Sequence, residues 1–86
     1  MSSTLDFARS LIRQPSVTPD DAGCQDLIAK ALQSVGFYAE FLTYGEVCNV
    51  WLRRGKVNPL LVFAGHTDVV PTGPIEKWHY PPFDAV

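Results

Sequence analysis

The sequence predicts an α/β fold in which two helices pack on a mixed sheet of three or four strands. Two stretches within the first 35 residues carry apolar side chains at helical spacing, and the stretch after residue 36 is rich in aromatic and β-branched residues. An uncharged apolar run follows at 60–64. The 86 residues suffice for one small domain or part of a larger one, and the 47% apolar fraction is typical of a globular chain.

The first helix is expected to begin at Ser3, which can cap it together with Asp6, and to end before Pro15. The second is expected to be capped by Thr18 and to end at Gly36, with Asp20 and the next residue, Asp21, as capping carboxylates rather than metal ligands. The apolar faces consist of Leu5, Ala8, Leu11 and Ile12 in the first helix and of Cys24, Leu27, Ile28, Ala31, Leu32 and Val35 in the second.

Three strands are expected after the helices. Residues 37–44 and 47–52 form the first two, joined by a turn at Gly45–Glu46, and a charged turn at 53–56 leads to the third. The third strand, at 60–65, lacks polar alternation, so we expect it to be buried on both faces.

Charge and hydropathy argue against several kinds of partner. The net charge is −2, and no basic stripe of the kind that binds nucleic acid is present. The longest apolar run is far shorter than the roughly 20 residues that cross a bilayer, and no basic segment leads into it as in a secretory signal. We therefore expect no nucleic acid and no membrane among the partners, and a cytoplasmic location.

The two cysteines, Cys24 and Cys48, are too few for a disulfide framework and lack the close spacing of a zinc site. We expect both to be buried, reduced thiols.

The chemistry is expected where the third strand ends. Gly65 lets the backbone turn, and His66 and Asp68 follow two residues apart. In an extended chain these two side chains point to the same face, which suits a metal-binding imidazole with a carboxylate beside it. The alternative is an ordinary polar loop after a strand.

The segment Trp78–Phe83 mixes aromatic residues with prolines, which exclude a regular helix. We expect a loop that covers an adjacent site or the sheet edge. His79 is expected to be exposed or packed, and not to be a metal ligand.

The string from Leu60 to Pro71, followed by Trp78 and Pro81–Phe83, resembles the dizinc aminoacylase and carboxypeptidase family. In that family a strand leads into a Gly-His-x-Asp-x-Val-Pro motif, which is matched here by Gly65, His66, Asp68, Val70 and Pro71. Within the family, residues 14–25 and 78–83 are similar to members that act on a succinylated amino acid.

This resemblance implies specific roles. His66 would be a zinc ligand, and Asp68 would be a catalytic residue that orients the imidazole. The complete enzyme would hold two zinc ions, with cobalt as a substitute, and would form a homodimer. It would hydrolyse the amide of a small-molecule succinylated amino acid with a water molecule as nucleophile.

The resemblance also implies that residues 1–86 are the amino-terminal portion of a zinc-hydrolase catalytic domain. The remaining zinc ligands, the general base and the lid or dimerisation domain would lie outside this sequence, and the fragment alone would be inactive. Two alternatives stay open. One is a related zinc peptidase or aminoacylase, and the other is a small non-catalytic α/β interaction module.

Overall fold

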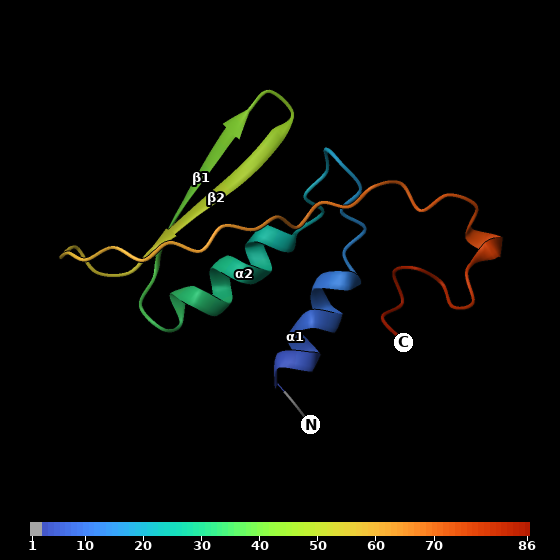
Figure 1. Cartoon of the computed structure of the whole chain (residues 1–86), viewed down its shortest axis with the longest axis horizontal. Helices are drawn as coiled ribbons and strands as arrows, with labels where there is room; N and C mark the ends of the chain where they lie inside the picture. The colour runs from blue at the N-terminus through green and yellow to red at the C-terminus, as the bar shows by residue number, and fades with distance from the viewer. Residues whose placement is uncertain (1–2) are drawn as a thin grey trace.

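A computed structural model describes residues 3–86 of the chain as two helices, one β-hairpin and a short 3-10 helix. The elements are α1 (Ser3–Ile12), α2 (Cys24–Gln33), β1 (Tyr38–Tyr44), β2 (Val47–Arg53) and η1 (Ile75–Lys77). Figure 1 shows α2 beneath the hairpin, with α1 farther from it. The α/β class is confirmed. Within residues 3–86, neither helix has the length and apolarity to cross a membrane.

The hairpin forms where the sequence predicts it. β1 and β2 pair antiparallel in a continuous register from Tyr38 opposite Arg53 to Tyr44 opposite Val47. The connecting turn is Gly45–Glu46, and Gly45 has a φ of 62°. A positive φ at the first of two loop residues matches the twist of a tight hairpin, and glycine adopts it without steric cost.

The predicted third strand is absent from the described residues, so the predicted mixed sheet of three or four strands is wrong. The sheet is antiparallel and has two strands. Residues 60–65 lie outside it, and Leu61 and Phe63 are 79% and 89% exposed. A strand buried on both faces needs hydrogen-bonded neighbours and covering layers. Instead, a groove of about 800 Å³ lies between residues 60–68, β2 and α2.

The core is small. Among the described apolar residues only Cys24 and Ala29, both in α2, are buried. α2 contacts both strands, and the Cys24 thiol lies 3.7 Å from the Leu11 carbonyl oxygen of α1. The radius of gyration is 15.1 Å, larger than the ~12 Å typical of a compact chain of this length. The apolar face predicted for α1 is therefore only partly covered.

Both cysteines are free, as predicted, but they differ in burial. Cys24 is buried where α2 meets α1, whereas Cys48 is exposed. The expectation of a buried Cys48 is wrong, because Cys48 lies near the turn end of β2 and borders the open groove between β2 and α2. The Cys48 sulfur lies 3.6 Å from the hydroxyl of Thr43 on the paired strand.

α2 begins later than the sequence predicts, at Cys24 rather than just after Thr18. The prediction fails because the Thr18 backbone and side chain bond to a distant segment instead of capping a helix. Asp21 takes the capping role. Its carboxylate accepts hydrogen bonds from the backbone N–H groups of Gly23 and Gln25, each at 3.2 Å, so the interpretation of Asp21 as a capping carboxylate is confirmed.

Replacing Asp21 with alanine should loosen α2. Loss of a capping carboxylate costs about 1 kcal/mol, so backbone amides in α2 should exchange with deuterium about fivefold faster in the natural full-length protein. Exchange by mass spectrometry measures this. Asp20→Ala is the matched control, because no hydrogen bond of the Asp20 side chain is found within residues 3–86. Equal exchange in both variants would contradict the capping role.

Candidate functional site

The structure brings His66 and Asp68 together, as their spacing predicts. The His66 Nδ1 atom lies 3.1 Å from Asp68 Oδ1 and 3.0 Å from the Asp68 backbone oxygen. A carboxylate oxygen and a carbonyl oxygen can only accept hydrogen bonds, so the Nδ1 of the neutral ring must carry the proton. The lone pair is then on Nε2. Because the His66 side chain is 82% exposed, this atom is open to a ligand.

The Asp68 carboxylate has a second partner. The Thr18 hydroxyl donates to Asp68 Oδ2 at 2.6 Å. This hydrogen bond is the main reason why the pKa of Asp68 lies below its usual value, and the hydrogen bond to His66 lowers it further, as does the charge of the imidazole when the ring is protonated. Asp68 is therefore ionised at neutral pH, in the form that accepts from both neighbours.

Residues 16–18 hold the loop that carries this pair. Val17 and Val69 form an isolated parallel bridge, in which Thr18 N donates to Val69 O at 3.0 Å and Val69 N donates to Ser16 O at 2.9 Å. Ser16 is only 3% exposed, and its hydroxyl donates to the Thr67 carbonyl at 2.8 Å. These bonds attach the His66–Asp68 loop to the connection between the two helices.

Sequence reasoning missed Ser16 and Thr18 as parts of this site. The available signal was two hydroxyl residues at alternate positions of a short connection before Pro19, a spacing that places both on one face when the chain is extended. That signal does not name a partner about 50 residues away, and Thr18 fitted the more common role of a helix cap.

The donor set suits one zinc ligand with its orienting carboxylate. Imidazole nitrogen is a standard zinc ligand, and a hydrogen bond from the other ring nitrogen to a carboxylate is the usual support for such a ligand. Within residues 3–86, no group of three histidine, cysteine, aspartate or glutamate side chains is placed to hold a metal ion.

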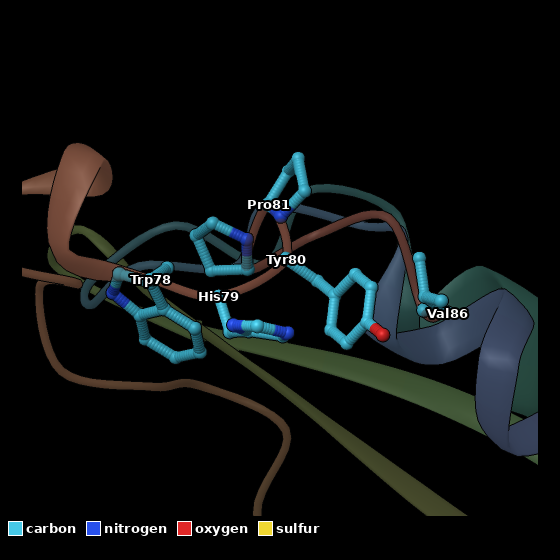
Figure 2. Close-up of a pocket in the computed structure, with 7 residues that line it drawn as sticks. Trp78, His79, Tyr80, Pro81 and Val86 are labelled. Carbon is cyan, nitrogen blue, oxygen red and sulfur yellow. The ribbon is translucent and has the colours of Figure 1, made fainter.

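The second histidine, His79, is exposed and packs against a neighbouring ring, in line with the expectation of an exposed or packed side chain. His79 packs edge-to-face against Tyr80, with ring centroids 4.8 Å apart and ring planes at 88°. Figure 2 shows the His79 ring between the Trp78 and Tyr80 rings. An open hollow of about 270 Å³ is lined by Trp78, His79, Tyr80, Pro81, Pro82, Ala85 and Val86.

The aromatic segment does not cover the sheet edge. In Figure 1 the chain from Thr72 onward extends away from the hairpin, and neither His66 nor Asp68 lines its hollow. The Trp78 indole donates to the Thr72 carbonyl at 3.0 Å, so the segment folds back on itself. The expected covering role of Trp78–Phe83 is therefore wrong for the described residues.

Replacing Ser16 with alanine should weaken the attachment of the loop. The change leaves the Thr67 carbonyl without its buried donor, which costs about 1–3 kcal/mol. We expect at least fivefold faster exchange of the Val69 amide, measured by NMR on the natural full-length protein. Ser10→Ala, which removes an exposed hydroxyl bonded within α1, should leave this amide unchanged. Unchanged exchange in Ser16→Ala would show that the serine does not fix the loop.

No protein-family model matches the chain. Curated relatives named succinyl-diaminopimelate desuccinylase are 61% identical over 85 residues in Hahella chejuensis, 63% over 83 in Thioalkalivibrio sulfidiphilus and 56% over 86 in Marinobacter nauticus. These alignments cover 96–100% of this chain but only 22–23% of each relative. Over nearly its whole length, the chain therefore resembles about a fifth of a succinyl-diaminopimelate desuccinylase.

Proposed function

We propose that the protein is a zinc-dependent amide hydrolase that releases succinate from N-succinyl-diaminopimelate, and that residues 1–86 are the amino-terminal part of its catalytic domain. The observation that carries the proposal is the His66–Asp68 pair. Its exposed Nε2 and bonded Nδ1 occur in a chain that is 56–63% identical to relatives named for this reaction.

Each residue of the pair has a separate task. His66 would bind zinc through Nε2. Asp68 would hold the proton on Nδ1 and fix the plane of the ring, which also makes the imidazole a stronger ligand. When bound, zinc supplies Lewis-acid chemistry that polarises an amide carbonyl and activates a water molecule. Because zinc sites need three or more protein ligands, the others would come from outside residues 3–86.

The names of the relatives support the proposed substrate. Hydrolysis of a succinyl amide consumes one water and yields succinate and a free amine, here diaminopimelate, an intermediate of lysine biosynthesis. We further propose two zinc ions per active site, replaceable by cobalt, and a cytoplasmic homodimer.

A related zinc peptidase or aminoacylase would use the same His66 and Asp68 chemistry on a different acyl group. The names of the relatives favour the succinyl amide over these. A non-catalytic interaction module would have no use for an imidazole whose Nε2 is exposed while Nδ1 is bonded to a carboxylate. Substrate assays separate the proposal from the first alternative, and zinc binding separates it from the second.

Replacing His66 with alanine should abolish zinc binding at this site and reduce hydrolysis of N-succinyl-diaminopimelate by at least 100-fold, because the ligand itself is lost. Zinc content and initial rates of the natural full-length protein measure this. His79→Ala is the matched control, since its ring packs on Tyr80 away from the pair. A His66→Ala protein with full zinc content and full activity would refute the proposed function.

Asp68→Asn should separate binding from rate. The amide retains the shape of the carboxylate and one oxygen acceptor but loses its charge. We expect zinc affinity to fall by about tenfold and kcat by about 100-fold. Titration with a zinc indicator and steady-state kinetics at saturating zinc distinguish the two effects. An unchanged kcat would show that Asp68 does not orient a catalytic ligand.

A further inference from the structure

We infer that Thr18 is a positioning residue for zinc binding: its hydroxyl holds the Asp68 carboxylate in the orientation that fixes His66 with Nε2 available. This inference rests on the proposed function. It assigns a role to a residue in the connection between the two helices, outside the Gly-His-x-Asp motif.

The Asp68 carboxylate is held at both oxygens by different partners. Thr18 Oγ1 donates to Oδ2 at 2.6 Å, and His66 Nδ1 donates to Oδ1 at 3.1 Å. The Asp68 side chain is 46% exposed, so packing alone does not fix it. Without the Thr18 hydroxyl, the carboxylate would keep one partner and could rotate away from the imidazole.

A backbone hydrogen bond fixes the position of Thr18 and therefore of its hydroxyl. Its backbone N–H is bonded to Val69 O at 3.0 Å, independently of the side chain. The hydroxyl lies 2.6 Å from the Asp68 carboxylate and 3.2 Å from Val69 O, and it has one proton to donate. An ionised carboxylate is the stronger acceptor, so the proton points to Asp68.

The orientation and tautomer of the His66 ring depend on this carboxylate more than those of a buried histidine would. Its side chain is 82% exposed, and the Nδ1 contacts that the structure shows are both to oxygens of Asp68. If the carboxylate rotates, the ring keeps only the backbone oxygen as its Nδ1 acceptor. The tautomer with the proton on Nε2, which cannot bind zinc through that atom, then gains population.

The test compares Thr18→Val with Thr18→Ser in the natural full-length protein. Valine keeps the branched shape and the backbone bridge but removes the hydroxyl, whereas serine keeps the hydroxyl. ¹⁵N NMR of histidine-labelled, metal-free protein reports the tautomer of His66, assigned by its absence in His66→Ala. In Thr18→Val we expect the Nε2–H share to rise at least threefold and the zinc affinity to fall about tenfold. In Thr18→Ser both should stay within about twofold of wild type.

A double-variant cycle separates positioning from general stability. If Thr18 acts through the Asp68 carboxylate, Thr18→Val should weaken zinc binding much less in an Asp68→Asn background than in wild type. A purely structural role would weaken both backgrounds equally and would overturn the inference. If Thr18→Val does not fold, Thr18→Ala removes the same hydroxyl and replaces it in the cycle.

The outcomes also separate this inference from the proposed function. An unchanged tautomer and zinc affinity in Thr18→Val, with zinc lost in His66→Ala, would overturn the role of Thr18 and leave the hydrolase proposal intact. Retention of zinc in His66→Ala would overturn the proposed function, and the role of Thr18 with it.

Discussion

Two backbone hydrogen bonds between residues 16–18 and residues 67–69 determine where the candidate site lies. They join segments about 50 residues apart, and the buried Ser16 hydroxyl adds a third bond to Thr67. The residues before this loop are largely exposed, and within the described chain they pair with no strand. The attachment to residues 16–18 is therefore what gives His66 and Asp68 a defined place relative to the helices.

The same attachment explains the local structure of the connection. The Thr18 hydroxyl donates to the Asp68 carboxylate and therefore does not cap a helix at this position. The helix α2 starts only at Cys24, after Asp21 has supplied the cap. The contacts that place the loop thus also engage the residue that the sequence predicts as the cap of α2.

Local signals in the sequence predict the elements that depend on neighbouring residues. The helix before Pro15, the helix end near Gly36 and the turn at Gly45–Glu46 all occur where residue types require them. The pairing of His66 with Asp68 was also predictable, because it follows from a spacing of two residues in an extended chain.

The features of the structure that could not be predicted depend on contacts between residues far apart in the sequence. The hydroxyl of Thr18 had a plausible local role as a cap, and nothing near it names Asp68 as the partner. The run at 60–64 has the composition of a buried strand, but composition does not say which strand lies beside it. In the structure these residues border an open groove, so a chain that is 47% apolar buries few of its apolar side chains.

The central claim is that His66 binds zinc through Nε2 while Asp68 holds Nδ1. A crystal structure of the zinc-loaded natural full-length protein tests this most directly. We expect zinc about 2.0–2.1 Å from His66 Nε2. His66 Nδ1 should lie within hydrogen-bond distance of one Asp68 carboxylate oxygen, and the Thr18 hydroxyl should contact the other. Zinc bound through Nδ1, or zinc sites that do not include His66, would contradict it.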